Sequence, residues 1–172
     1  LAICEKALGK EHPDTARGLN NLADLYRSQR IYSRALPLYQ RSLAIWEGVL
    51  GPEHSNIATS LNNLAFVYES LGNYAQALPM YERALAIANK ALGPEHPDTA
   101  IMLSNLAALY QAQGDHPHAL PLMQQALGIW ENAQGRGHPG TTIALSNLAA
   151  LYHSQGNYVQ ALPLCRQSLI NT

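Results

Sequence analysis

Histidine is the residue type in this sequence that most directly suggests metal chemistry. His12, His54, His96 and His138 recur at a constant step of 42 residues. Neutral imidazole is a common metal ligand, but zinc needs its nitrogen ligands at about 2.1 Å. If two helices with axes about 8–10 Å apart separate equivalent residues, successive histidines lie roughly 20 Å from each other. They cannot share one ion, so we expect them to cap or bridge helix ends, with no metal and no cofactor.

Asparagine recurs at the same step and could bind a polypeptide backbone. The row comprises Asn21, Asn63, Asn105 and Asn147. An Asn amide both donates and accepts hydrogen bonds, so such a row can pair with an extended peptide of any sequence. Alternatively, each Asn bonds to a neighbouring helix or caps a turn. The residues by themselves leave both interpretations open.

Catalytic chemistry is not indicated. Acid–base or nucleophilic catalysis needs unlike groups that converge in one pocket, and no Ser/His/Asp or Cys/His arrangement is suggested. His116 and His118 form a local pair without further ligands nearby. Trp46 and Trp130 share one place in the repeat, where the unit between them has Ala88. We interpret them as packing residues and predict a non-enzymatic protein.

The elements that must position these residues form an internal repeat. The strings NNLADLY, NNLAFVY, SNLAALY and SNLAALY begin at Asn20, Asn62, Ser104 and Ser146. Strings that begin with Leu-Pro at Leu36, Leu78, Leu120 and Leu162 keep the same 42-residue step. A repeat of this length is typical of a solenoid, in which stacked neighbours bury the apolar faces that one unit cannot bury alone.

Each repeat predicts two helices, and the fold class is therefore all-α. In the first repeat, apolar residues at helical spacing follow a start at Pro13 and Asp14, and the helix should stop near residues 28–30. A second helix should run over residues 32–50, and the last one over 158–171. Pro37 lies inside the second helix, removes one backbone hydrogen bond and predicts a small bend rather than a break.

The turn of the first repeat departs from the pattern. Later repeats have Gly72, Gly114 and Gly156 just past the first helix, where glycine enters the left-handed conformation without strain. Arg30 takes this place in the first repeat. We therefore expect the first turn to be looser or differently closed.

We expect one array over residues 1–172. Residues 13–54, 55–96 and 97–138 form complete repeats, residues 1–12 form the tail of a preceding one, and residues 139–172 form a truncated last one. Neither end shows the polar capping helix that such arrays normally need. This favours a piece of a longer array with uncapped ends.

Composition narrows the classes of partner. Charged residues make up 13% of the chain, and 11 basic residues balance 12 acidic ones for a net charge of -1. Nucleic-acid binding needs a basic face, and no Lys/Arg cluster or long apolar run suggests a membrane. Cys4 and Cys165 lie near opposite ends and should not pair. Buried reduced thiols would fit a cytoplasmic protein.

The packing residues resemble the tetratricopeptide repeat (TPR). Small and aromatic residues fall where that family has its signature side chains, and later repeats preserve most of them. In the first repeat these are Leu19, Leu22, Ala23, Tyr26, Ala35 and Tyr39. The 42-residue unit with its link GPEHPDTA is similar to the kinesin light chain type, and the charge-poor sequence is similar to bacterial kinesin-light-chain-like proteins. The resemblance implies a right-handed α-α superhelix whose first helices line a concave groove for a peptide segment.

The resemblance also implies which residues line the groove. They are Arg17, Asn20, Asn21, Asp24, Asn62, Asn63, Phe66, Ser104, Asn105 and Asn147. The Asn row matches the groove asparagines of peptide-binding members. Arg17 could supply one basic residue of a clamp for a terminal carboxylate, but Thr59, Ile101 and Ile143 take its place in later repeats. We therefore predict a neutral to partly apolar peptide as the ligand.

Two functions follow from these observations. The first is a protein–protein interaction scaffold that binds a partner's peptide in the groove. The second is an assembly module that associates end to end through its uncapped terminal helices, because a non-closing contact of this kind produces long assemblies.

Overall fold

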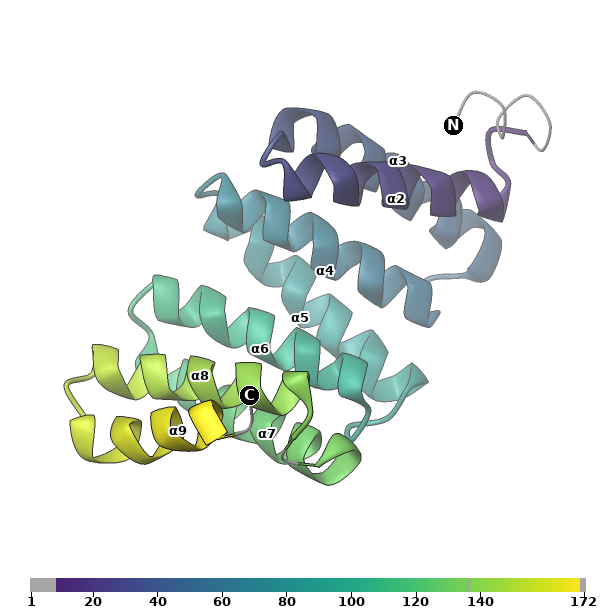
Figure 1. The fold of residues 1–172 in the computed structure, drawn as a ribbon. Helices are drawn as coiled ribbons and strands as arrows, with labels where there is room; N and C mark the ends of the chain where they lie inside the picture. Colours follow the sequence, from purple (N-terminus) through teal and green to yellow (C-terminus); the bar gives the residue numbers. More distant parts are fainter. Residues whose placement is uncertain (1–8, 136, 171–172) are drawn as a thin grey trace. The chain divides into compact units, whose positions relative to one another are not determined.

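The computed structural model describes residues 9–135 and 137–170, and these contain eight α-helices (Figure 1). The chain forms two compact units, Leu1–Ala91 and Leu92–Thr172. In the first unit the helices are α2 (Pro13–Ser28), α3 (Tyr32–Leu50), α4 (Ser55–Ser70) and α5 (Tyr74–Ala91). In the second unit they are α6 (Pro97–Ala112), α7 (His116–Gln134), α8 (Pro139–Ser154) and α9 (Tyr158–Ile170).

Helix–turn–helix pairs are the building blocks of both units. In the first unit α2 packs on α3, α3 on α4 and α4 on α5, and in the second unit α6, α7, α8 and α9 pack in the same sequence. The expected all-α repeat fold is confirmed, and the expected starts at Pro13 and Tyr32 agree with the structure. The predicted tail of a preceding helix falls on residues 1–8, which lie outside the described part of the chain.

Small residues where the helices cross build the core. Ala23 and Ala35 have no exposed surface, and the fully buried ring of Tyr39 fills the space beside them. Leu64 and Val67 of α4 complete this cluster. The same five places two repeats later hold Ala107, Ala119, Met123, Leu148 and Leu151. Two places differ: a leucine replaces a valine, and the thioether of Met123 replaces the phenol of Tyr39.

The turn at Arg30 corrects one expectation. Arg30 adopts φ 59°, in the left-handed region that Gly72 (75°), Gly114 (77°) and Gly156 (72°) occupy in the other repeats. The N–H of Ile31 donates to the carbonyl of Tyr26 at 2.8 Å, just as the N–H of Asn73 donates to the carbonyl of Tyr68 at 2.8 Å. The first turn is therefore closed in the same way as the others, and the expectation of a looser turn is wrong. Arginine carries the steric cost of this conformation.

The prolines lie inside their helices without ending them. Pro37 in α3, Pro79 in α5, Pro121 in α7 and Pro163 in α9 each have helix on both sides, as predicted. The lost backbone hydrogen bond lies near the start of each helix, where few intrahelical bonds have yet formed.

The repeated histidines are helix caps, as predicted. The imidazole Nδ1 of each histidine accepts a hydrogen bond from the backbone N–H two residues later, at 3.1–3.2 Å. The four pairs are His12 with Asp14, His54 with Asn56, His96 with Asp98, and His138 with Gly140. This satisfies one of the otherwise unpaired donors at each helix start.

A buried threonine ties three of these starts to a glycine six residues earlier. Thr99 and Thr141 are fully buried, and their hydroxyls donate to the carbonyls of Gly93 and Gly135 at 2.9 and 2.7 Å. Thr15 makes the same bond to Gly9 at 2.8 Å. Ile57 takes this place at the start of α4 and is buried without a hydroxyl. The start of the first helix is thus held by a polar bond in three repeats, and the second repeat has the buried side chain of Ile57 in its place.

Candidate functional site

Polar residues of two successive first helices meet in the first unit. Arg17 and Asn20 of α2 and Thr59 of α4 line an open pocket of about 310 Å³. Trp46, from the end of α3, forms one wall and also packs on the core residues Ala16, Leu19 and Ile45. The remaining lining residues are Asn56 and Ser60.

Arg17 supplies the positive charge of this pocket. Its guanidinium pairs with Asp14 at 2.8 Å, and 70% of its side chain is exposed. Exposed ion pairs of this kind contribute only about 0–1 kcal/mol, so a ligand carboxylate could compete for the guanidinium. Beside it, the amide Nδ2 of Asn20 donates to Asp24 at 3.2 Å, while Asn20 Oδ1 is buried without a hydrogen-bond partner among the described residues.

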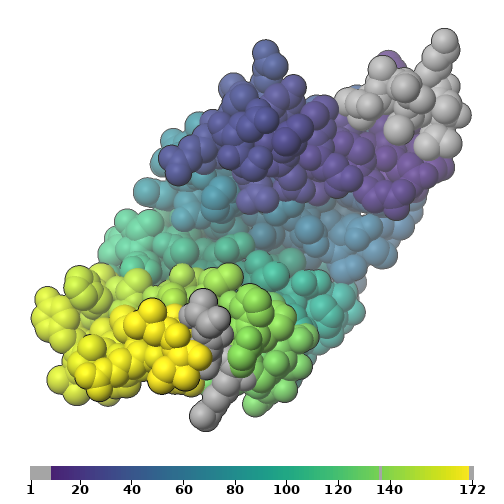
Figure 2. Space-filling view, in the orientation of Figure 1, coloured from purple at the N-terminus to yellow at the C-terminus, as the bar shows by residue number. Residues whose placement is uncertain are grey.

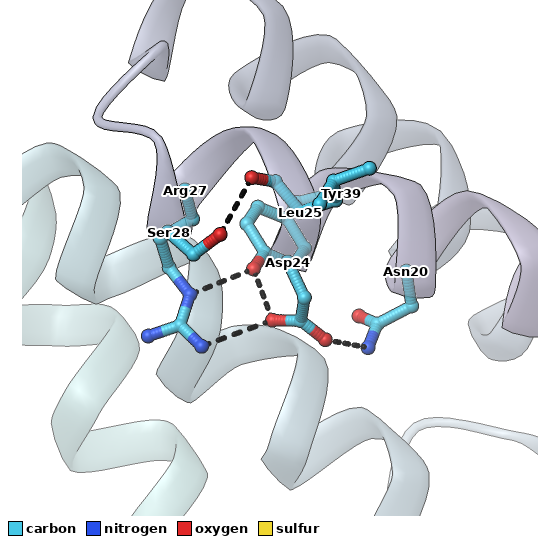
Figure 3. Close-up of polar contacts among 6 residues, drawn as sticks. All are labelled: Asn20, Asp24, Leu25, Arg27, Ser28 and Tyr39. Carbon is cyan, nitrogen blue, oxygen red and sulfur yellow. Dashed lines mark hydrogen bonds and ion pairs between the residues drawn. The ribbon is translucent and has the colours of Figure 1, made fainter.

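Asp24 is held within the fold by a cluster of polar contacts (Figure 3). The hydroxyl of Tyr39 donates to Asp24 Oδ1 at 2.5 Å, and Arg27 Nη2 donates to the same oxygen at 3.1 Å. Arg27 Nε also donates to the Tyr39 oxygen at 3.1 Å. Burial, followed by the adjacent Asp24, raises the pKa of Tyr39 well above its ordinary value. The Asp24 carboxylate therefore joins α2 to α3, with both of its oxygens already engaged.

Phe66 lies against this cluster. The guanidinium of Arg27 sits 5.3 Å from the centre of the Phe66 ring, within the usual range for a cation–π contact. This contact joins α2 to α4. Asp24 and Phe66, both expected in the groove, thus take part in contacts within the first unit.

In the next repeat, the buried tyrosine hydroxyl donates its hydrogen bond to a glutamate instead of an aspartate. The hydroxyl of Tyr81 in α5 donates to Glu69 Oε2 in α4 at 2.7 Å. Burial raises the pKa of Glu69, and the hydrogen bond from Tyr81 offsets this only in part. In the third repeat Met123 replaces the tyrosine and has no hydroxyl to satisfy. The acidic partner is accordingly absent from the α6 positions that correspond to Asp24 and Arg27, which are Ala108 and Gln111.

The second unit has a pocket in the corresponding place, but a larger part of its lining is apolar. Its volume is about 330 Å³, and it lies between α6, α8 and the end of α7. Ile101 and Ile143 stand where the first unit has Arg17 and Thr59, and they are 43% and 61% exposed. The other lining residues are Ser104, Asn105, Trp130, His138, Gly140, Ala144 and Asn147.

The predicted groove residues are therefore only partly brought together. Arg17 and Asn20 share the pocket of the first unit, and Ser104, Asn105 and Asn147 share that of the second. Asn21 is exposed and Asn63 half-buried, and neither lines these pockets. Asn62 is 7% exposed and offers the least surface of the set.

The residues that sequence reasoning missed are those that enclose the pockets. The sequence pattern predicts Trp46 and Trp130 only as packing residues, and it does not distinguish Asn56, Ser60 and Gly140 from other polar or small residues. A tryptophan at the same place in two repeats was the available signal. That signal could not reveal a pocket, because a sequence repeat does not show how three helices converge around the tryptophan.

Metal and membrane features can be stated for the described residues. No three His, Cys, Asp or Glu side chains in that part of the chain gather closely enough to hold a metal ion. His118 pairs with Asp115 at 2.7 Å and stacks on Tyr110, so it has a structural role. None of the described helices combines the length and apolar character needed to cross a bilayer.

The two thiols differ from expectation. Cys165 is a free cysteine and is exposed, so the prediction that it is buried is wrong. Its helix, α9, lies at the surface of the second unit (Figure 2). The face that carries Cys165 has no following helix packed on it in the described part of the chain. Cys4 lies outside the described residues.

Comparison with known proteins decides the family. The tetratricopeptide repeat model matches residues 1–45, 30–90, 56–131 and 98–169, which together cover nearly the whole chain. The chain belongs to the tetratricopeptide repeat family. TPR modules generally serve as protein-interaction scaffolds and are typically non-catalytic. No curated protein sequence matches this TPR chain.

Solved structures similar to this TPR protein are of the kinesin light chain type. The crystal structure of BtubC (BKLC) from P. vanneervenii matches with a TM-score of 0.85 and 25% identity, over 98% of this chain and 68% of that one. TPR-like repeats from Podospora anserina, in a protein described as a kinesin light chain, match with a TM-score of 0.77 and 29% identity, over 99% and 81% of the two chains. A single-substitution variant of those repeats gives 0.80 and 29%, over 99% and 80%.

Proposed function

We propose that this chain is a non-enzymatic scaffold that holds an extended, neutral to partly apolar peptide segment of a partner protein on its first helices. The observation that carries the proposal is that both units place a pocket between successive first helices at the same place in the repeat. Amide side chains at the edges of the pockets, Asn20 in one and Asn105 and Asn147 in the other, could bond to a peptide backbone. A cytoplasmic location belongs to this proposal, since an exposed free thiol persists most readily in a reducing compartment.

Charge supports a neutral ligand over an acidic one. Arg17 is the only Lys or Arg among the residues that line the two pockets, and it already has Asp14 as a neighbour. A clamp for a terminal carboxylate would need a second basic group close by. We therefore expect Arg17→Ala to weaken binding of a peptide with an acidic end by no more than a few fold.

The test is a selection from a random dodecapeptide library on the full chain, followed by titration of synthetic peptides with capped ends. We expect Asn147→Ala to weaken binding about two- to tenfold, because a lost hydrogen bond in a binding site costs about 0.5–1.5 kcal/mol. Asn157→Ala, in the turn between α8 and α9, is the matched control and should leave binding unchanged. Failure to select any peptide, or equal binding by both variants, would contradict the proposal.

A second candidate function rests on the terminal helix. Three apolar side chains of α9 are largely exposed: Val159 (83%), Leu162 (54%) and Leu169 (76%). On α2, Leu25 is 53% exposed, whereas Val67 and Leu151 in the same place on α4 and α8 are fully buried. These two faces could meet between copies of the chain, which is the end-to-end association considered above.

A further inference from the structure

The two pockets are one structural device that occurs twice. Each lining residue of the first pocket has a counterpart two repeats later that lines the second. Trp46 corresponds to Trp130 at the end of the second helix, and Arg17 corresponds to Ile101 on the first. In the repeat between them the tryptophan is replaced by Ala88, which is fully buried. The tryptophan is thus specific to the two repeats that form these pockets.

The two pockets both contain amides and hydroxyl groups, but they differ where Ile101 and Ile143 replace Arg17 and Thr59. The first offers a guanidinium, two amides and two hydroxyls from Arg17, Asn20, Asn56, Thr59 and Ser60. The second has no Lys, Arg, Asp or Glu among its lining residues. Its isoleucines are exposed although burial of such a side chain is worth about 1.5–3 kcal/mol. A polar version of the same place exists in this very chain, so the helix geometry does not require the isoleucines.

Gly140 sets the position of the Trp130 ring. A Cβ atom at residue 140 would lie 2.5 Å from Trp130 Cε3, so no other residue fits there unless the indole moves. The ring stacks on His138 with centroids 5.3 Å apart and an interplanar angle of 14°. His138 is itself fixed, because its Nδ1 accepts from the Gly140 N–H at 3.1 Å. The first unit has Asn56 at this place. The Trp130 ring is therefore held by its contacts with Gly140 and His138, whereas Trp46, the corresponding wall of the first pocket, has no glycine at that place.

The size of the pocket indicates what could occupy it. A volume of about 330 Å³ is at the lower end of the range for small-ligand sites, about 300–1,000 Å³. It suits one large side chain better than a cofactor. Asn105 and Asn147 on its edge could hold the main chain on either side of such a residue.

We propose that the Trp130 pocket binds one bulky apolar side chain, such as leucine or phenylalanine, of an extended partner peptide, and that Ile101, Ile143 and Trp130 determine this specificity. The inference rests on the proposed function, since the peptide's main chain is held by the same groove.

The two repeats supply their own variants for the test. The double variant Ile101→Arg and Ile143→Thr gives the second pocket the residues of the first. Both positions are exposed, and the corresponding helices of the first unit carry Arg17 and Thr59 there. Leu71→Thr, which also removes an exposed apolar side chain (53%) but lies at the end of α4, is the matched control. A random dodecapeptide library is selected on the full-length chain and on both variants, and far-UV circular dichroism verifies that each is folded.

We expect peptides selected by the unmodified chain to share one bulky apolar residue. Replacing that residue with alanine, or using the double variant, should weaken binding about tenfold or more, and Leu71→Thr should not. The chain has two tryptophans, so Trp46→Phe leaves Trp130 as the sole tryptophan, whose fluorescence can be excited selectively over that of the tyrosines. Its emission should shift when such a peptide binds.

Other results would separate the two proposals. Binding that depends on Asn147 but is unaffected by the isoleucine substitutions would overturn this inference and leave the proposed function intact. So would a Trp130 emission that does not respond to the bound peptide. Failure of the unmodified chain to select any peptide would overturn both.

Discussion

At the scale of single residues, the repeat shows where a backbone conformation is required whatever the side chain. The turn after each first helix requires a left-handed residue, and three repeats use glycine while the first uses Arg30. The same hydrogen bond closes the turn in each case. The left-handed turn is therefore a general feature of the repeat, and Arg30 adopts it at a steric cost.

Arg30→Gly should stabilise the chain. An L-residue in the left-handed conformation destabilises the folded state by about 1–2 kcal/mol. Glycine removes this cost, but its greater freedom in the unfolded chain lowers the gain by about 0.5–1 kcal/mol. We expect a net gain of about 0.5–1 kcal/mol in the free energy of unfolding, measured by urea denaturation. Gly114→Arg, at φ 77° with open space around it, is the reciprocal variant and should destabilise the chain. A loss of stability in Arg30→Gly would show that the arginine side chain contributes more than its conformation costs.

At the scale of elements, helices are joined by polar contacts as well as by the apolar core. Gln40 Nε2 donates to the Tyr68 hydroxyl at 3.0 Å, and Gln124 makes the same bond to Tyr152 at 3.1 Å. Tyr81 and Glu69 join α4 to α5. Among these contacts, the last one places an ionisable carboxyl where burial opposes its charge.

The contact between Glu69 and Tyr81 predicts a defined pH dependence. Below pH 4.5, the ordinary pKa of this carboxyl, it is largely protonated in both the folded and unfolded states. Because burial raises the folded pKa, the folded state is destabilised as the pH rises from about 4.5 through that raised value. Gln at this place still accepts from Tyr81 but does not titrate. The stability of Glu69→Gln minus that of the unmodified chain should therefore increase with pH and then level off.

Urea unfolding between pH 3.5 and 8 measures this difference. Tyr81→Phe removes the hydrogen bond that favours the carboxylate, so in that variant stability should fall more steeply with pH. A difference between Glu69→Gln and the unmodified chain that is constant with pH would contradict the assignment.

At the scale of the whole molecule, the fold followed from the sequence more completely than the site did. The 42-residue step, the Pro13 start and the helix-ending glycines predicted the helices nearly to the residue. The hydrogen bond between Asp24 and Tyr39 could not be predicted from the sequence, because the two residues are 15 positions apart. Only the crossing of α2 and α3 brings them together. The pockets could not be predicted either, because side chains from three helices enclose each one. The groove of Asn21, Asn63, Asn105 and Asn147 stays a prediction, as does the single array over residues 1–172.

End-to-end association is a property of the whole molecule and can be tested by mass. If the exposed face of α9 binds another copy, light scattering should show a mass that rises with concentration above 18.8 kDa. Leu169→Glu should then restore the monomer mass, because a carboxylate cannot be buried unpaired at low cost. Ile143→Thr, which changes an exposed apolar residue on α8 instead, should not alter the association. A mass of 18.8 kDa at every concentration would reject this second function.

The histidine caps have a consequence for the protons of the imidazole rings. Nδ1 accepts a backbone hydrogen bond in all four caps, so in the neutral ring the proton must reside on Nε2. His12, His54, His96 and His138 therefore share one tautomer, fixed by the main chain. The sequence repeat is thus also a repeat of proton positions, with one N–H directed away from the start of each first helix.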